Sequence, residues 1–398
     1  MEQERAPLLR NTRFVQLWVG QGFSFVGDAI SMIAMIILVV DLTGSASAVG
    51  GVLVARLVPT LAGPFVGVLT DRLDRRAILV ASDLSRAALV FGVVFVREVW
   101  LLYALFFLVG LARTFFNPTI RAAFPSVVGA GDLTRANGIV SGTFSASIFL
   151  GPAIGGPLVA AVGVNAAFVI DAATYLVSAL FLSRIPLPRP EGGGSESFST
   201  ELKAGLGYLA GALIPLAIVA GAFLLMLTAS ITVPAEVFLA KETFGAGDVG
   251  YGLLVATWGG GMVLGSAVIA LLGDRVNLLA FYFVGIFVSA LALAGAGLSP
   301  VFALALVAVA AGGVANGVDN VTTDTILQKR VPEALLGRVF SVRFLTISVG
   351  EILAYPVGGL LVDATGPRFT YVAMGAATGV MGAMILLLIT AFPGRGAR

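Results

Sequence analysis

Five charged residues inside long apolar stretches are the side chains of this sequence best suited to chemistry. Asp28, Arg56 and Arg113 lie in the first third of the chain, and Asp319 and Glu351 lie near its end. If these stretches cross a bilayer, each charge costs about 2.5–3.5 kcal/mol and needs a partner, water or a function. A carboxylate that meets an arginine in one state and a dry cavity in another would bind and release a proton.

These carboxylates are therefore candidate proton carriers, with Asp28 first, Glu351 second and Asp319 third. Arg113 and Arg56 are the expected charge partners of Asp28. The alternative for Asp28 is a permanent ion pair with one of these arginines, and the alternative for Glu351 is a structural or gating role. Two further carboxylates in apolar stretches are expected to serve a cytoplasmic gate and the structure, respectively: Asp324 and Asp171.

Histidine and cysteine are absent, which excludes several classes of function. The chain can form neither disulfides nor thiolate metal sites, and it lacks the usual general base. Ser141 lies in a glycine-flanked segment that superficially resembles a serine-protease loop, but no histidine is present to activate it. No Gly-x-x-x-x-Gly-Lys phosphate loop occurs, and a net charge of +2 gives no sign of nucleic-acid binding. We expect a non-enzyme with no metal and no cofactor.

The composition indicates that membrane-spanning helices position these residues. Hydrophobic residues make up 58% of the 398-residue chain, charged residues make up 12%, and the mean hydropathy is +1.01. A bilayer span needs about 20 apolar residues. The sequence predicts an all-α membrane protein with twelve helices, at about 14–40, 47–70, 77–97, 100–122, 134–161, 165–184, 212–240, 248–272, 277–297, 300–327, 335–362 and 369–391.

The distribution of basic residues predicts the orientation. One set of predicted helix ends is rich in arginine and lysine, whereas the opposite set carries only Arg97, Lys241 and Arg368. The positive-inside rule then places both termini in the cytoplasm of a cell with this protein in its inner (plasma) membrane. No apolar segment with a cleavage site follows the charged first residues, so no removed signal peptide is expected.

The sequence also predicts two halves. We expect an N-terminal bundle over 1–184, a cytoplasmic linker over 185–211 and a C-terminal bundle over 212–398. The linker is rich in proline and glycine and is expected to be flexible, and residues 201–213 are a candidate interfacial helix.

An internal repeat supports this division. Shifting the chain by 203 residues aligns scarce features at five places; shared composition alone is the alternative explanation. Both halves begin on the same predicted side, as in transporter halves related by an axis along the membrane normal. The aligned pairs are Asp71-Arg72 with Asp274-Arg275, Gly110 with Gly313, Asn117 with Asn320, Arg135 with Arg338, and Gly155-Gly156 with Gly358-Gly359.

Two motifs resemble signatures of the major facilitator superfamily. The segment 67–76 matches the G-x-x-x-D-R-x-x-R-R loop between helices two and three, through Gly67, Asp71, Arg72, Arg75 and Arg76. Helix five resembles the antiporter signature, with Ser147 in place of one glycine; its matching residues are Gly138, Gly151, Pro152, Gly155 and Gly156. Other segments resemble the drug:proton antiporter branch that includes macrolide-efflux and enterobactin-export proteins.

The resemblance implies a fold of two six-helix bundles and roles for both motifs. Asp71 would approach the N-terminus of the helix that begins near Glu333 and latch the cytoplasmic side, where a helix dipole favours a carboxylate. Arg72 and Arg76 would pair with acidic groups, and Asp83 with Arg86 could join them. The alternative is that these charges are simply solvated.

The helix-five glycines are expected to pack closely against helix eight, whose own glycines are Gly259-Gly260-Gly261 and Gly265. Generic packing of small residues within each half is the alternative. Pro152 is expected to bend helix five because it lacks a backbone N–H.

The resemblance further implies proton-driven export of lipophilic small molecules, by a protein expected to be a monomer in the lipid bilayer. Met and aromatic side chains adapt to varied ligands. The candidate cavity residues are Phe23, Met32, Asn117, Phe223, Met226 and Asn316. The alternative functions are a lysophospholipid flippase, which shares the Gly27-Asp28 pair, and a siderophore exporter.

Overall fold

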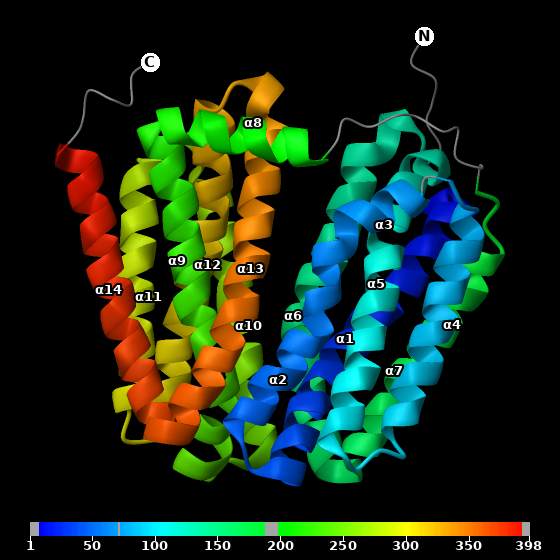
Figure 1. The fold of residues 1–398 in the computed structure, drawn as a ribbon, viewed down its shortest axis with the longest axis horizontal. Helices are drawn as coiled ribbons and strands as arrows, with labels where there is room; N and C mark the ends of the chain where they lie inside the picture. The colour runs from blue at the N-terminus through cyan, green and yellow to red at the C-terminus, as the bar shows by residue number, and fades with distance from the viewer. Residues whose placement is uncertain (1–7, 71, 188–197, 392–398) are drawn as a thin grey trace. The chain divides into compact units, whose positions relative to one another are not determined.

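The computed structural model describes residues 8–70, 72–187 and 198–391, and within these ranges it contains helices and no β-strand. Figure 1 shows the arrangement. The α-helices are α1 (Thr12–Thr43), α2 (Ala46–Leu57), α3 (Gly63–Thr70), α4 (Arg75–Val93), α5 (Val99–Val128), α6 (Leu133–Val162), α7 (Val164–Ser183), α8 (Phe198–Gly211), α9 (Leu213–Phe238), α10 (Gly247–Leu272), α11 (Leu278–Leu298), α12 (Phe302–Arg330), α13 (Glu333–Thr365) and α14 (Pro367–Ala391).

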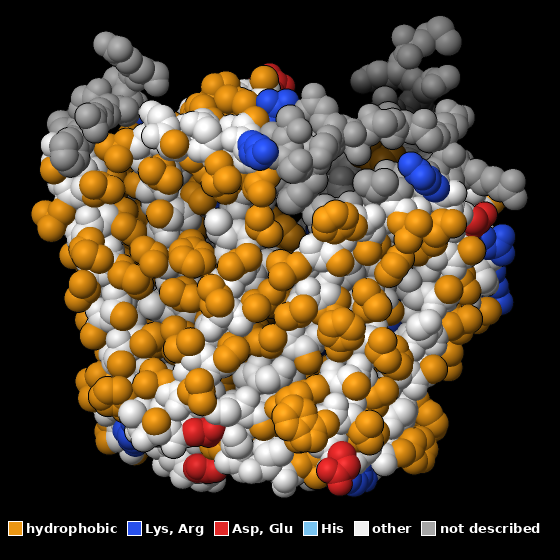
Figure 2. Space-filling model, viewed as in Figure 1, with side chains coloured by type: hydrophobic (Ala, Val, Ile, Leu, Met, Phe, Trp, Pro, Cys, Tyr) orange, Lys and Arg blue, Asp and Glu red, His pale blue; other side chains and the backbone are white. Residues whose placement is uncertain are grey.

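Among the described residues, ten helices are long and apolar enough to cross a membrane, which makes the chain a multi-pass membrane protein. On the face shown in Figure 2, hydrophobic side chains cover the middle of the helices, and lysine, arginine, aspartate and glutamate gather near the helix ends. A surface of this kind suits lipid along the flanks and water at both ends.

The predicted continuous helix over 47–70 is wrong. The structure breaks it into α2, a 3₁₀ turn η2 (Val58–Ala62) and α3. Pro59 lies in the first positions of η2, where its missing N–H interrupts the α-helical hydrogen bonds. The break places Arg56 in the last turn of α2.

The chain divides by its internal contacts into two compact units. The first consists of Met1–Thr43 and Ala55–Gly194, and the second of Gly44–Val54 and Ser195–Arg398. A helix is present near the predicted 201–213, namely α8, which belongs to the second unit and packs on α13 and α9; its interfacial position stays a prediction. In Figure 1, α8 lies across the ends of these helices.

The same pattern of helix packing recurs in both units. In the first unit, α1 packs on α6 and α7, and α4 packs on α5 and α7. In the second unit, α9 packs on α13 and α14, and α11 packs on α12 and α14. Each helix corresponds to its counterpart in the shift of 203 residues found in the sequence.

Two glycines related by this shift each allow two helices to pack closely. A Cβ on Gly110 would collide with the carbonyl of Arg56, and a Cβ on Gly313 would collide with the carbonyl of Trp258. Only glycine lets α5 cross α2, and α12 cross α10, at such short backbone separations. This matched close approach supports the internal repeat.

The expectation that the helix-five glycines meet helix eight is wrong for four of the residues concerned. Gly155 lies against Ile30 of α1, with 3.3 Å between an added Cβ and the Ile30 Cα, and Gly151 lies against Ala29. Gly261 and Gly265 of α10 face carbonyls of α12 instead. These glycines serve packing inside each unit, because each unit's own helices already occupy the space beside them.

Candidate functional site

Asp28 of α1 is the centre of a buried polar cluster in the first unit. Its Oδ1 accepts a hydrogen bond from the Tyr175 hydroxyl at 2.5 Å and another from Arg56 Nη2 at 3.2 Å. The other terminal nitrogen of Arg56 lies 3.3 Å from the sulfur of Met32. The structure thus brings α1, α2 and α7 together around one carboxylate, as the sequence predicted for Asp28 and Arg56.

Two further arginines and a second carboxylate act on Asp28. Arg113 of α5 and Arg86 of α4 both attract its charge, whereas Asp171 of α7 repels it. Asp171 is 1% exposed, and the Thr174 hydroxyl lies 3.4 Å from its Oδ1. Gly27 leaves the space for Asp171, because an added Cβ would lie 2.6 Å from the same oxygen.

Arg86 connects this cluster to a second ion pair. Its guanidinium lies between two aromatic rings, 4.3 Å from the centroid of Phe116 and 4.4 Å from that of Tyr175, and it pairs with Asp83. Asp83 is 0% exposed and Arg86 is 3% exposed. The prediction that these two residues join a network at the loop is wrong, since they lie inside the unit and contact the Asp28 cluster. Facing aromatic rings stabilise a buried guanidinium that water cannot reach.

The cluster is balanced in formal charge. Its three carboxylates and three arginines come from α1, α2, α4, α5 and α7. Such a balance offsets the cost of burying ions, and every partner lies on a different helix or turn. A shift of any of these helices would therefore change the electrostatic surroundings of Asp28.

The second unit carries its buried charges differently. Asp324 of α12 accepts a bond from Arg343 of α13 at 2.6 Å, and Asp319 is 7% exposed, with Thr323 as a hydroxyl neighbour at 3.5 Å. Glu351 of α13 forms no ion pair with any residue that the structure describes. Its role as a proton carrier stays a prediction.

Glu236 and Tyr175 are polar residues that sequence reasoning missed. Glu236 lies near the end of α9, close to Tyr251 and Tyr371, both almost fully buried. It lies inside the predicted helix 212–240, observed as α9, but it was not among the carboxylates singled out from the sequence. Tyr175 had no signal of its own, because a tyrosine in an apolar helix usually serves packing.

Two arginines of the signature over 67–76 bind backbone carbonyls of the first unit. Asp71 lies outside the described residues, so its latch stays a prediction. Arg75 donates to the carbonyl of Ala122 at 3.4 Å, and Arg76 donates to the carbonyl of Ser183, the last residue of α7. The expected acidic partner of Arg76 stays a prediction. Free carbonyls and the negative dipole end of α7 attract the arginine.

The remaining residues of the signatures have plain surroundings. Gly67 and Gly138 have open space where a Cβ would stand, and Arg72 is exposed. Pro152 lies inside α6, which continues past it to Val162.

The predicted cavity residues have diverse surroundings. Phe23 is 53% exposed, and Asn117 is also exposed. Asn316 accepts a bond from Asn320 at 3.0 Å, and Phe223 packs against Gly350. Met32 and Met226 are half-buried. Their assignment to a substrate cavity stays a prediction.

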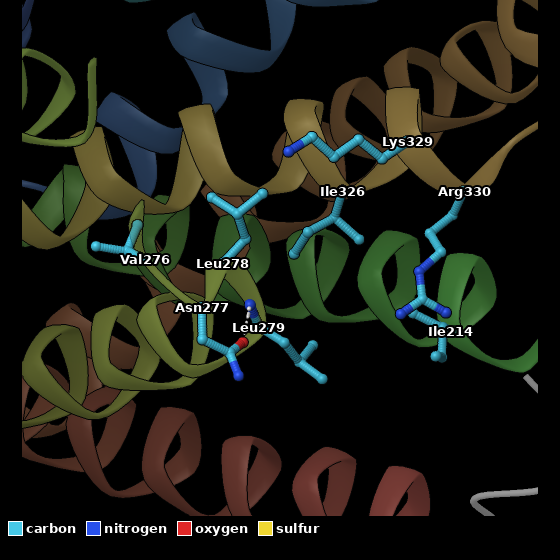
Figure 3. Close-up of a pocket in the computed structure, with 8 residues that line it drawn as sticks. All are labelled: Ile214, Val276, Asn277, Leu278, Leu279, Ile326, Lys329 and Arg330. Carbon is cyan, nitrogen blue, oxygen red and sulfur yellow. Dashed lines mark hydrogen bonds between the residues drawn. The ribbon is translucent and has the colours of Figure 1, made fainter. Parts of the chain in front are cut away.

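A pocket of about 220 Å³ lies at the ends of α9, α11 and α12 (Figure 3). Lys329 lies beside Ile326 and Arg330 points toward Ile214, and Asn277 caps α11 by accepting a bond from the Leu279 amide at 3.1 Å. None of the predicted cavity residues lines this pocket. Among the described residues, no cluster of acidic residues could hold a metal ion.

The sequence has recognisable relatives. The family model described as transmembrane secretion effector matches residues 3–395. The chain is 30% identical to a putative bacilysin exporter of Bacillus amyloliquefaciens, covering 87% of each protein. It is 24% identical to macrolide efflux protein A of Streptococcus pyogenes, over 91% of this chain and 92% of that protein. An enterobactin exporter of Shigella boydii is 26% identical, over 81% and 78% of the two chains.

Solved structures share the fold. A nucleoside transporter superimposes with a TM-score of 0.79 at 14% identity, covering 94% of this chain and 99% of that chain. A bacterial homologue of the lysosomal transporter Spinster gives 0.76 at 14% identity, covering 98% and 99%. At these identities the likeness concerns the fold. The relatives in both comparisons are transporters and not enzymes.

Proposed function

Because the chain belongs to the transmembrane secretion effector family of the major facilitator superfamily, we propose that it exports lipophilic small molecules in exchange for protons. Twelve spans would form two pseudo-symmetric six-helix bundles, 1–184 and 212–398, joined by the linker 185–211. The bundles would rock about a central cavity and expose it to each side in turn. The repeated helix packing in the two units supports this arrangement.

The Asp28 cluster is the observation that carries the proton-coupling part of the proposal. A neighbouring cation favours the charged form of a carboxylate, and burial without one favours the neutral form. Asp28 lies in α1, Arg56 in α2 and Tyr175 in α7. A movement that separates Arg56 from Asp28 would promote proton uptake, and its return would promote release.

The names of the relatives guide the choice of cargo. Bacilysin, macrolides and enterobactin are exported by proteins of similar sequence, according to the names of those proteins. The exposed Phe23 and half-buried Met32 and Met226 would suit a lipophilic cargo that is recognised loosely. Siderophore export and lysophospholipid flipping are the alternative functions within the same fold.

The orientation and assembly complete the proposal. The protein would work as a monomer in the inner (plasma) membrane, with both termini and α8 on the cytoplasmic side. The proton gradient would supply the energy, and no bound cofactor would be needed.

Transport by purified protein in liposomes tests the function directly. Uptake of radiolabelled erythromycin should rise when the interior of the liposomes is made more acidic than the outside. An uncoupler, which dissipates this gradient, should abolish the rise. Parallel liposomes with enterobactin and with fluorescent lysophosphatidylethanolamine test the alternatives. Uptake of none of these, or uptake indifferent to the gradient, would contradict the proposal.

Matched variants then locate the coupling residue. Asp28→Asn should lower pH-driven uptake at least about tenfold while retaining erythromycin binding, because the amide cannot carry the proton. Glu98→Gln, an exposed residue before α5, is the control and should transport normally. If Glu351→Gln abolishes coupling and Asp28→Asn does not, the coupling site lies in the second unit.

A further inference from the structure

One segment of the chain packs with the second unit, although the residues on either side of it in the sequence belong to the first unit. Gly44–Val54, here called the strap, belongs to the second unit, while the residues before it (to Thr43) and after it (from Ala55) belong to the first. The strap comprises most of α2. Any relative movement of the two units must therefore strain both flanks of the strap or detach it from the second unit.

A single carboxylate of α13 holds the first turn of the strap. Asp363 accepts three hydrogen bonds: Oδ1 from the Ala46 amide at 2.8 Å, and Oδ2 from the Ser47 amide at 3.0 Å and the Ser45 hydroxyl at 2.9 Å. The first amides of a helix have no partner in their own helix. Asp363 therefore acts as the N-terminal cap of α2, supplied by a different helix, and its charge suits the positive dipole end.

Two glycines bring the backbones of the strap and α13 close together. A Cβ on Gly359 would lie 2.6 Å from the Ser47 Cα, and a Cβ on Gly50 would collide with the carbonyl of Tyr355. The backbones of α2 and α13 meet at these two glycines. The bonds to Asp363 are the polar part of this contact, so the carboxylate is well placed to decide whether it holds.

Both flanks of the strap are able to bend. Gly44 has φ +61°, a conformation that favours glycine, and nothing lies within 4 Å of where its Cβ would be. At the other end, the α-helix gives way to η2 at Pro59. Two weak points therefore flank the segment that Asp363 holds.

The sequence repeat shows that this contact is particular to one helix pair. Shifting Asp363 by the repeat of 203 residues leads to position 363 − 203 = 160, which is Ala160. An alanine cannot cap a helix. The chain therefore has this carboxylate in only one of two equivalent positions.

We propose that Asp363 is a positioning residue of the transport cycle: it clamps the strap to α13 in one state and releases it when the protein changes state. This inference rests on the proposed alternating-access function. In the released state, water would bind the amides of Ala46 and Ser47, so the release leaves no buried group without a partner. The strength of the clamp then sets how often the protein leaves the clamped state.

Thiol labelling measures the release without any cargo. The chain has no cysteine, so a single introduced cysteine is the sole thiol. Val49 is 0% exposed in the strap, and Val49→Cys should react slowly with a water-soluble maleimide. Adding Asp363→Asn should raise the labelling rate about tenfold, because a helix cap of this kind is lost. Ser45→Ala removes one of the three bonds to Asp363 and the bond that the Ser45 hydroxyl accepts from the Ala48 amide at 3.3 Å; it should raise the labelling rate less than Asp363→Asn.

Thr365→Ala is the matched control. Thr365 lies near Asp363 on the same helix, but its hydroxyl donates to the Leu361 carbonyl of α13 itself at 2.7 Å. It should leave the labelling rate unchanged. Equal rates for Val49→Cys with and without Asp363→Asn and Ser45→Ala would overturn the clamp, whatever the cargo proves to be.

A reversible lock tests whether release is needed for transport. In Ser45→Cys/Asp363→Cys, a short bis-methanethiosulfonate should join the two thiols and stop pH-driven uptake, and reduction should restore the rate of the unlocked double variant. Uptake that continues in the cross-linked protein would overturn the proposal. If the unlocked wild type transports nothing, the proposed function has failed, and the labelling assay still judges the clamp.

Discussion

The two units neutralise the acidic residues of their helices in different ways. In the first unit, Asp28 and Asp83 each pair with an arginine, and Arg86 and Arg113 also attract Asp28 from other helices. In the second unit, Arg343 pairs with Asp324, whose side chain is 45% exposed, and Glu351 has no ion pair among the described residues. Equivalent positions of a repeated fold thus carry different electrostatics.

This difference predicts that the stability of the two units depends on their charged residues to different degrees. A balanced, interlinked cluster resists the loss of any member, because each removal leaves an opposite charge buried. A lone carboxylate loses no partner when it is neutralised. The first unit should therefore depend on its charges for stability, and the second unit should tolerate their removal.

The largest loss of unfolding free energy is expected for Arg86→Gln. The change leaves Asp83 buried without its cation and removes the guanidinium between Phe116 and Tyr175. We expect a loss of about 3–5 kcal/mol of unfolding free energy, measured by denaturant unfolding in mild detergent. Arg97→Gln is the control, since Arg97 is exposed and binds the Val96 carbonyl at 2.8 Å. Equal stability of the two variants would show that the cluster is not structural.

A second change tests whether the unpaired charge causes that loss. Adding Asp83→Asn to Arg86→Gln should recover part of the unfolding free energy, because no buried carboxylate is then left without a cation. A double variant that is no more stable than Arg86→Gln would instead assign the loss to packing between the aromatic rings.

A smaller effect is expected for Arg343→Gln in the second unit. Asp324, its partner at 2.6 Å, is nearly half exposed, so water can replace the arginine. We expect a loss of at most about 1 kcal/mol in the same unfolding assay. A loss as large as that of Arg86→Gln would remove the contrast between the units.

The smallest effect is expected for Glu351→Gln. The substitution preserves shape and breaks no ion pair among the residues described, so unfolding free energy should stay within about 0.5 kcal/mol of the wild type. Marked destabilisation would mean that Glu351 is held by a charged partner, and it would then resemble Asp28.

Apolar length and composition predicted the helix positions well, because each span must satisfy its backbone internally. The predicted 134–161 and 165–184 correspond to α6 and α7 within a few residues. The exception is 47–70, where Pro59 was present in the sequence, but apolar character on both sides concealed the break. The spans themselves, ten by length and composition, agree with a multi-pass membrane protein.

The centre of the site was predictable because charge is scarce in apolar stretches. This scarcity singled out Asp28 and Arg56, which the structure joins at 3.2 Å. The depth of Asp83 and Arg86 was not predictable, since their spacing indicates a pair on one helix face but not which neighbours cover that face. Asp363 gave no signal either, because a carboxylate at a helix end usually meets water.

The assignment of the strap to the second unit has a consequence for how the protein is assembled. If the polypeptide were divided between residues 187 and 198, the downstream fragment would be missing eleven or so residues of its own packing, and Gly359 would meet lipid or water instead of α2. The upstream fragment would carry that missing piece. In newly made protein, the second unit would therefore complete its packing only by binding the strap, which is part of the half of the chain synthesised first.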